Sequence, residues 1–381
     1  MIKYVDELEK EDLKGKRVLL RLDLNVAVND GQIVDDFDIQ RVIPTIDFLR
    51  EKGSQIIIIA HIENSNGEAT TLLPVFDSLK GYFPIEFCPT YFTPESVDKL
   101  LKMDNKSVLL FENLRINRGE KENDPEFMKK LSAMGDIFVN DAFGVSHREH
   151  ASIVGVPRLL PHYGGLLMRQ EIEHLSQVLN PKHPFVFVLG GAKFETKLPL
   201  IKKYLDKADS VFVGGALANN IFKEKGYEVG KSFLSNGDFN LKKIINNPKL
   251  AIPEDVTVEG SDSKVEFKKP DEVSKNECIV DAGPETMKQL KALLKGAKTI
   301  VWNGPLGNYE KGFGDKTESL AEMIAAETSK GSTGIIGGGD TLATINLSKL
   351  SHKFSFVSTG GGAMLDYLVN ETLPGIRALE S

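Results

Sequence analysis

The stretch from Thr333 to Leu368 reads TGIIGGGDTLATINLSKLSHKFSFVSTGGGAMLDYL and contains the same pattern twice. In each half, a short apolar run is followed by three glycines and then by a helix-like segment. A strand, a glycine turn and a helix start place backbone N–H groups where they can bind an anion, and glycine lets a phosphate approach because it has no Cβ. One triplet alone would suit an ordinary turn. Two triplets, each beside a hydroxyl or carboxylate, indicate a ligand with several phosphates or two phosphorylated ligands that meet. These glycines are Gly337, Gly338, Gly339, Gly360, Gly361 and Gly362.

The composition is that of a water-soluble globular protein of more than one domain. The chain has 381 residues, of which 41% are apolar and 27% charged, and this length favours two domains. The net charge of −7 argues against binding to nucleic acid, although a local basic cleft could still attract an anionic substrate. Cys88 and Cys278 have no metal-type spacing and fit a reducing compartment.

No part of the sequence resembles a targeting or membrane segment. The first residues are charged and lack the apolar centre of a signal peptide. No apolar run reaches the roughly 20 residues that a membrane span needs. We therefore expect a cytoplasmic protein that acts away from membranes, and we expect a monomer.

Short apolar runs alternate with amphipathic segments through the first half of the chain. Residues 17–24 and 55–60 read as strands, and residues 36–51 and 72–82 as helices. In the first of these helices, Ile39, Val42 and Ile46 recur at helical spacing. Strands that alternate with helices indicate βαβ units and a mainly parallel sheet.

The second half repeats this alternation after a connecting segment. We expect a first domain over residues 1–165, a connecting helix over 166–181 and a second domain over 182–365, with residues from about 366 to 381 packed back on the first domain. The predicted fold is α/β, with two doubly wound parallel-sheet lobes joined by a hinge helix. Ligands of such sheets bind at the carboxyl ends of the strands, where nearly all the glycines of this chain occur.

Motifs along the whole chain resemble the phosphoglycerate kinase family. The first half contains LRLDLNVAV, FENLR and FVNDAFGVSHREHAS, and the second half contains LGGAKFETK, VFVGGALA, TIVWNGPLGNYE, IIGGGDT and VSTGGGA, in the family's order. A single motif such as GGGD is weakly specific, but the complete series is very specific. The resemblance implies an enzyme that transfers a phosphoryl group between 1,3-bisphosphoglycerate and ADP with Mg²⁺, giving 3-phosphoglycerate and ATP in glycolysis.

The resemblance assigns the nucleotide to the second lobe. Lys193 and Lys197 are four residues apart, so both can lie on one side of a helix, and they are implied to contact phosphates, with Lys197 also catalytic. Asp340 is implied to hold Mg²⁺, although it also suits a helix N-cap. The glycines at 360–362 are implied to present a helix N-terminus to the moving phosphoryl group. The other implied nucleotide-binding residues are Gly214, Gly215, Leu217, Asn303, Glu310, Gly337, Gly338, Gly339 and Thr341.

The first lobe is implied to bind the phosphoglycerate. Arg115 and Arg148 match the arginines that clamp the distal phosphate, a task suited to a planar guanidinium. Asp23, Asn25 and His61 match contacts to the substrate hydroxyl and carboxylate. Further positive charge is expected from Arg21, His147 and His150.

This chain departs from the family pattern at two positions of the first lobe. Asp38 stands where the family has an arginine at the start of the first helix, an alignment fixed by Pro44. Asn64, preceded by Glu63, stands where the family has the arginine of a Gly-Arg-Pro turn. The family uses the first of these arginines at the transferred phosphate, so a carboxylate there would oppose a transition state rich in negative charge.

These departures leave alternatives to an active phosphoglycerate kinase. Arg41 lies three residues after Asp38 on a neighbouring part of the same helix face and could take over the catalytic role. Otherwise the chain would be a catalytically impaired relative that binds nucleotide, or a kinase for a different acyl acceptor. A nicotinamide-dependent dehydrogenase is disfavoured, because no G-x-G-x-x-G opens a βαβ unit.

Overall fold

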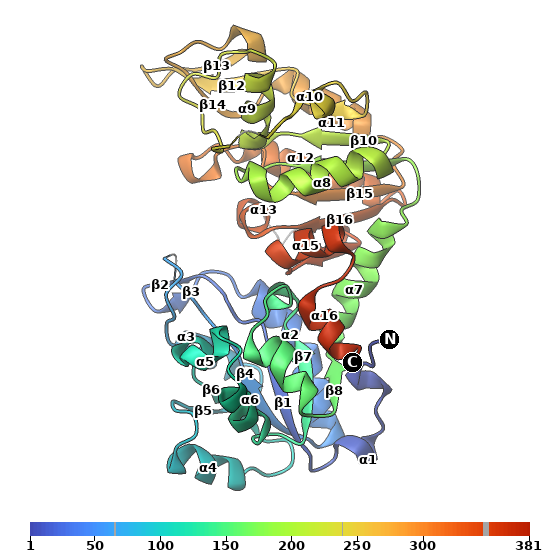
Figure 1. Ribbon diagram of the computed structural model, residues 1–381. Coiled ribbons are helices and arrows are strands. Elements are labelled where there is room, and N and C mark those ends of the chain that lie inside the picture. The colour runs from blue at the N-terminus through green and yellow to red at the C-terminus, as the bar shows by residue number, and fades with distance from the viewer. Residues whose placement is uncertain (65, 238, 346–349) are drawn as a thin grey trace. The chain divides into compact units, whose positions relative to one another are not determined.

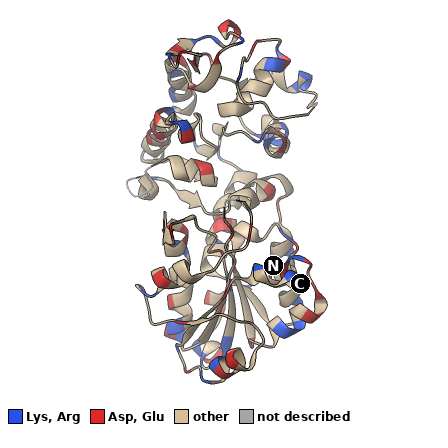
Figure 2. Cartoon of the chain, turned by 90° about the vertical axis from the view of Figure 1, so that its left-hand side faces the viewer, with Lys and Arg blue, Asp and Glu red and all other residues tan. Residues whose placement is uncertain are grey.

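The computed structural model describes residues 1–64, 66–237, 239–345 and 350–381. The chain forms two compact units, Met1–Glu173 with Thr372–Ser381, and His174–Glu371 (Figure 1). Charged residues of both signs lie along the helices and loops of each unit (Figure 2). No helix in the described part of the chain is long and apolar enough to span a membrane. Part of the helix-like segment expected after Thr341 falls on residues 346–349, outside the described residues.

The first unit is built on a six-stranded parallel sheet with the order β5-β6-β4-β1-β7-β8. Successive residues of its central strands enter two different apolar clusters, as Leu19 and Leu20 do in β1. Both faces are therefore buried, which explains the near-continuous apolar runs in the sequence. The strands are β1 (Arg17–Leu22), β4 (Gln55–Ile59), β5 (Glu86–Cys88), β6 (Val108–Phe111), β7 (Ile137–Asp141) and β8 (His162–Gly164).

Capping residues mark some of the helix ends in the first unit. The side chain of Asp124 accepts the N–H of Phe127 (2.7 Å) at the start of α6, so Asp124 is its N-cap. Gly53 ends α2 in the left-handed conformation that glycine adopts without strain. The helices are α1 (Lys10–Leu13), α2 (Phe37–Lys52), α3 (Leu73–Leu79), α4 (Pro94–Leu101), α5 (Arg118–Lys121), α6 (Pro125–Ser132) and α16 (Pro374–Leu379), beside a small hairpin of β2 (Val28–Asn29) and β3 (Gln32–Ile33).

The second unit repeats this plan with a six-stranded parallel sheet of order β11-β10-β9-β15-β16-β17. In both sheets the strand order reverses at an inner strand, so the fold is α/β and doubly wound as predicted. The strands are β9 (Phe185–Leu189), β10 (Ser210–Val213), β11 (Leu250–Ala251), β15 (Thr299–Asn303), β16 (Thr333–Gly337) and β17 (Phe356–Ser358). The helices are α8 (Phe194–Lys207), α9 (Gly215–Glu224), α10 (Lys242–Ile245), α11 (Pro284–Leu294), α12 (Asp315–Thr328), α13 (Gly339–Thr344) and α15 (Gly362–Asn370).

A separate antiparallel sheet accounts for the region between Asn236 and Cys278, which the sequence pattern left unordered. It pairs β12 (Val256–Glu259) with β13 (Val265–Lys268) on one side and with β14 (Cys278–Ala282) on the other. The outer strand β13 is exposed at three of its four residues. This exposure explains why its sequence is charged and lacks an apolar run.

The division between the units falls inside α7 (Leu166–Leu179) rather than at its ends. The carboxyl-terminal segment also joins the first unit later than residue 366, because α15 is held within the second unit. Lys203 Nζ donates to the carbonyl of Val369 (2.8 Å), near the end of that helix. From Thr372 onward the chain belongs to the first unit, where the N–H of Gly375 donates to the carbonyl of Ser146 (2.8 Å).

One glycine at a strand end of the second sheet lets backbone segments pack directly on one another. A Cβ on Gly190, just after β9, would lie 2.2 Å from the carbonyl oxygen of Pro305 and 2.4 Å from that of Gly304. Real Cβ atoms do not approach backbone so closely, and the backbone cannot swing aside as a side chain can. By contrast, a Cβ on Gly339, the first residue of α13, would meet no atom within 4 Å.

We expect Gly190→Ala to lower the free energy of unfolding by about 1–3 kcal/mol, because the added methyl overpacks a backbone contact. Gly339→Ala should leave the free energy of unfolding nearly unchanged or raise it slightly, since alanine favours helix. Urea denaturation of both variants and the wild type measures the difference. Equal stability of the two variants would contradict this explanation of Gly190.

Candidate active site

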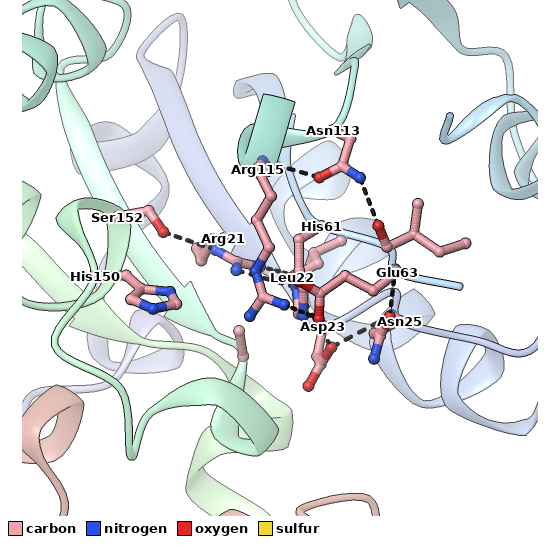
Figure 3. A network of polar contacts seen from close by, with 12 residues as sticks. Arg21, Leu22, Asp23, Asn25, His61, Glu63, Asn113, Arg115, His150 and Ser152 are labelled. Carbon is pink, nitrogen blue, oxygen red and sulfur yellow. Dashed lines mark hydrogen bonds and ion pairs between the residues drawn. The ribbon is translucent and has the colours of Figure 1, made fainter. Parts of the chain in front are cut away.

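Polar and charged side chains gather at the carboxyl ends of four neighbouring strands of the first sheet (Figure 3). Each strand buries its apolar residues along its length, and its polar residues follow at the end. We call this group the acid-site cluster. Its members are Arg21, Asp23 and Asn25 at the end of β1, His61 and Glu63 after β4, Asn113 and Arg115 after β6, and Arg148 and His150 after β7.

Arg21 is wholly buried and held by several partners. Its Nε donates to Ser152 Oγ (2.9 Å), its Nη1 donates to the Leu22 carbonyl, and its Nη2 lies 3.3 Å from His61 Nδ1. Ser152 Oγ donates in turn to Glu120 Oε1 (2.6 Å). Burial lowers the pKa of Arg21, and the nearby charge of Glu120 opposes that shift. A guanidinium is fixed here in one orientation, with a buried carboxylate to balance its charge.

One of the two histidines expected to add positive charge, His150, does not do so. Burial and the charges of Arg115, Arg148 and Arg21 together lower the pKa of His150 to about 4, with burial the largest cause. The same causes, burial first, hold the pKa of His61 well below its usual value. The prediction of a charged His150 is therefore wrong, because another cation among three arginines is unfavourable. Both rings offer hydrogen bonds rather than charge at neutral pH.

Three predicted substrate residues, Asp23, Asn25 and His61, lie together. Asp23 Oδ1 accepts the N–H of Asn25 (3.4 Å) and lies 4.0 Å from His61 Nδ1. Burial raises the pKa of Asp23, while Arg21 is the largest influence that lowers it. The carboxylate, the amide and the neutral imidazole thus provide both acceptors and donors, which suits a ligand that carries hydroxyl groups.

Arg115 is engaged by a residue that was not predicted to be functional. Its Nη1 forms an ion pair with Glu63, whose other carboxylate oxygen lies 3.0 Å from Lys121 Nζ. Arg148 also lies close enough to lower the pKa of Arg115, after the larger effect of burial. The available clue in the sequence was the position of Glu63 inside the altered turn after His61.

The structure gives Asn64 a local task instead of a place in the acid-site cluster. Asn64 Oδ1 accepts the N–H groups of Asn66 and Glu68 (both 3.0 Å), and its Nδ2 donates to Glu68 Oε2 (2.9 Å). The exposed side chain thereby closes a turn in which Asn64 and Glu68 also share a backbone hydrogen bond. An arginine at this position would carry charge, whereas the asparagine only shapes the loop.

Asp38 lies in the first turn of α2, next to the acid-site cluster. Burial raises the pKa of Asp38 to about 7, and repulsion from Asp23, Asp35 and Glu171 acts in the same direction. Arg41 opposes this shift, although its Nη2 donates to Gln170 Oε1 on α7 (2.9 Å). The structure therefore brings Asp38 beside Asp23 and turns part of Arg41 toward α7.

Two adjoining cavities lie at the carboxyl ends of strands in the second sheet. One is lined by α9, β14 and the loop after β15, and it includes Gly215, Glu310 and Asp340 among the predicted residues. The other is lined by the glycine turns and the start of α8, and it shares Ala192 and Asp340 with the first. The predicted residues that line this second cavity are Lys193, Lys197, Asn303, Gly338, Gly339, Asp340, Thr341, Gly361 and Gly362.

Lys197 is the buried cation of this pair of cavities. Its Nζ donates to the carbonyl of Gly190 (2.6 Å), and only 8% of the residue is exposed. Burial lowers the pKa of Lys197 to about 8, Lys193 lowers it as well, and Asp340 opposes them. An anion that enters the cavity would considerably stabilise the charged form of a lysine held this way.

Four residues expected at the nucleotide site do not line either cavity: Gly214, Leu217, Gly337 and Gly360. Leu217 does not line the cavity because of its position on the α9 helix. Positions 215, 216, 218, 219 and 222 of α9 line the cavity, whereas Leu217 is wholly buried and does not line it. Leu217, implied by the resemblance to bind the nucleotide, is therefore replaced along this cavity by its neighbours Ala218 and Phe222.

Some lining residues were missed although helical spacing could have found them. Thr196 lies between the two predicted lysines on α8, and Asp366 lies one turn after Gly362 on α15. Asp281 of β14 lines the other cavity, and burial raises its pKa to about 7. No spacing rule would have identified Asp281, because its position depends on the antiparallel sheet.

The raised pKa of Asp38 predicts how the stability of the protein depends on pH. Its ordinary value is 3.8 and its folded value about 7, so the folded state holds a proton that the unfolded state releases. Stability should therefore fall as pH rises from about 4 to 7. We expect Asp38→Asn to remove this loss and to stabilise the protein by about 1–2 kcal/mol at pH 8, after allowance for solvent screening.

Urea denaturation at pH 5 and pH 8 measures this effect. The control is Asp47→Asn on the same helix, since the Asp47 side chain is 48% exposed and pairs with Arg50 near the surface. A gain for Asp38→Asn that is no larger at pH 8 than at pH 5 would contradict the proposed protonation.

The comparisons with known proteins agree with this geometry. The phosphoglycerate kinase family matches residues 8–371. Among curated relatives, the phosphoglycerate kinase of Thermosipho africanus is 41% identical over 97% of this chain and 96% of its own length, and that of Dictyoglomus turgidum is 38% identical over 99% of both. Solved phosphoglycerate kinases from Coxiella burnetii (36% identical, TM-score 0.82) and Pyrococcus horikoshii (29% identical, TM-score 0.84) cover the entire chain and 99% and 98% of their own. The chain belongs to the phosphoglycerate kinase family.

Proposed function

We propose that the chain catalyses reversible phosphoryl transfer between the acyl phosphate of 1,3-bisphosphoglycerate and ADP, giving 3-phosphoglycerate and ATP. The observation that carries this proposal is the family match over residues 8–371. The two strand-end sites support it, because one combines arginines with hydroxyl-binding groups and the other combines lysines with glycine turns. We further propose that the chain works as a cytoplasmic monomer.

The acid-site cluster would bind the phosphoglycerate. Arg115 and Arg148 carry the charge for its phosphate, and guanidinium groups suit phosphate because they can offer two parallel donors. Asp23, Asn25 and His61 would bind the hydroxyl and carboxylate end. In the direction of ATP consumption, a carboxylate oxygen of 3-phosphoglycerate attacks the terminal phosphorus of ATP, and the bond to ADP breaks.

The cavities of the second unit would bind the nucleotide. The base would occupy the cavity beside Ala218 and Phe222, where Glu310 is available for the ribose hydroxyls. The phosphates would lie against Lys193, Lys197 and the glycine turns. Catalysis of phosphoryl transfer depends mainly on alignment and on positive charge around the transferred group, which these residues supply.

Asp340 is the residue proposed to hold Mg²⁺. It borders both cavities, and no three carboxylate, histidine or cysteine side chains converge on a metal site among the described residues. One carboxylate suits Mg²⁺, which commonly relies on substrate phosphates and water for its other ligands. When bound, the ion would neutralise part of the charge on the phosphates.

Nucleotide affinity should depend on pH through Lys197. Its charged form binds phosphate, and its pKa is about 8. We expect the affinity for magnesium–ADP to fall about tenfold between pH 7 and pH 9, because the free enzyme loses this proton. Lys197→Arg should remove the dependence since guanidinium stays charged, and Lys197→Ala should weaken binding at every pH. Titration calorimetry measures these affinities. A pH-independent affinity in the wild type would contradict the role of Lys197.

Turnover should respond to Asp38 if it occupies the position of the family's arginine. Asp38→Arg is expected to raise turnover at least tenfold, which corresponds to about 1.4 kcal/mol of barrier. Asp38→Asn should give a smaller gain, because it removes repulsion without adding attraction. A coupled assay with 3-phosphoglycerate and ATP measures both, and detectable turnover in the wild type also tests the proposed function.

In the same assay, Arg41→Ala distinguishes an enzyme in which Arg41 has taken over the catalytic role from one in which phosphoryl transfer is impaired. If Arg41 has taken over the catalytic role, its removal abolishes turnover and Asp38→Arg adds little. If transfer is impaired, Arg41→Ala has a small effect and Asp38→Arg restores activity. High wild-type turnover that responds to none of these variants would show that Asp38 does not lie at the moving phosphate.

A further inference from the structure

Glu63 places a negative charge inside the most basic part of the first unit. Its carboxylate pairs with Arg115 Nη1 through one oxygen (Figure 3). The other oxygen lies 3.0 Å from Lys121 Nζ. Only 15% of the Glu63 side chain is exposed, and the Arg115 side chain is fully covered. An anion therefore has no open path to the Nη1 side of Arg115 while Glu63 occupies it.

The surrounding hydrogen bonds fix the positions of Glu63 and Arg115 relative to each other. The N–H of Glu63 donates to Asn25 Oδ1 (2.8 Å). Asn113 fixes both sides of the pair, because its Nδ2 donates to the carbonyl of Ile62 (2.6 Å) and its Oδ1 accepts the N–H of Arg115 (2.9 Å). Hydrogen bonds thus fix the main chain on both sides of this ion pair. A surface ion pair differs, because it joins two side chains that are free to move.

Arg115 has further N–H donors beside this carboxylate that bind no partner among the described residues. Its Nε and Nη2 are buried and have no hydrogen-bond partner among the described residues. A guanidinium carries five N–H donors, and buried donors without partners are costly. Arg148 and His150 are close neighbours that act on the pKa of Arg115 or respond to it. This side of Arg115 therefore favours an anion with several acceptor oxygens.

Glu63 keeps its charge through the physiological pH range. Burial raises its pKa, but the hydrogen bonds from Lys121 and Arg115 outweigh burial and hold the pKa below its usual value. Lowering the pH to 5 would consequently leave the carboxylate ionised. Its interaction with Arg115 is a constant feature of the site.

We propose that Glu63 is a specificity-determining residue whose carboxylate competes with the anionic group of the substrate for Arg115. An incoming phosphate or carboxylate displaces Glu63 from Arg115, and Lys121 retains the displaced side chain. An anion that reaches only Arg115 is weakly bound, whereas a ligand with a second anionic group gains further contacts within the cluster. This inference rests on the proposed function only for the identity of the ligand.

Titration calorimetry of the full chain with 3-phosphoglycerate, and separately with inorganic phosphate, tests the competition. Glu63→Gln keeps the shape and removes the charge, so both anions should bind about tenfold more tightly. Glu63→Ala provides a second variant if the amide disturbs the loop. Glu122→Gln is the matched control, because Glu122 is an exposed carboxylate close in sequence that pairs with Arg118, and it should change affinity less than twofold.

A double-mutant cycle locates the effect. In an Arg115→Met background, Glu63→Gln should no longer tighten anion binding, because the group for which the two anions compete is absent. Equal tightening in both backgrounds would overturn the inference and assign the effect to general electrostatics.

The two probes distinguish this inference from the proposed function. If Glu63→Gln and Glu63→Ala tighten inorganic phosphate while no variant binds 3-phosphoglycerate, Glu63 competes as inferred and the proposed substrate is wrong. If 3-phosphoglycerate binds equally well to the wild type and both variants, the substrate stands and the competition is refuted. If neither anion binds any variant, the cluster is not an anion site and both proposals fall.

Discussion

Burial of both faces of each parallel sheet is the constraint on which this protein depends. Strands such as β4 and β9 are apolar along almost their full length, because helices or loops cover both sides of the sheet. Polar groups can then gather only where the strands end. In parallel strands these carboxyl ends lie along one edge, so the acid-site cluster and the two cavities of the second unit follow from the same packing rule.

Burial also sets the charge of the groups at those strand ends. His61 and His150 are neutral chiefly because they are buried, with nearby arginines adding to the effect, while burial depresses the pKa of Lys197 and raises that of Asp38. In each case desolvation disfavours the charged form, and neighbouring charges add to it or oppose it. The acid-site cluster therefore contains fewer charges than its sequence suggests. An anion that enters would find hydrogen-bond donors that are already oriented. Several of the groups that are neutral in its absence could then take up a proton.

The family membership and the local chemistry answer different questions. Similarity over nearly the whole chain accounts for the fold and the class of reaction. It does not explain the repulsion between Asp38 and Asp23 or the ion pair of Glu63 with Arg115, because Asp38 and Glu63 depart from the family pattern. Asn64 illustrates the point in another way, since its side chain closes a turn where an arginine would have carried charge. Changes in a few loop residues can alter the acid site without disturbing the two sheets.

The sequence by itself determined the fold class, central strands of the first parallel sheet and most residues that line the cavity of the glycine turns, because apolar periodicity and glycine position are local properties. The strand expected over residues 55–60 corresponds to β4 and the helix expected over residues 36–51 to α2, each within one residue at either end. Lys193, Lys197 and Asp340 line the cavities of the second unit. Tertiary structure alone decided which side of α9 faces the cavity, which excluded Leu217, and how the antiparallel sheet places Asp281. It alone paired Glu63 with Arg115 and set the charge of His150 and Asp38. Such contacts join residues far apart in the chain, and pKa values depend on everything packed around a group, so no local pattern encodes them.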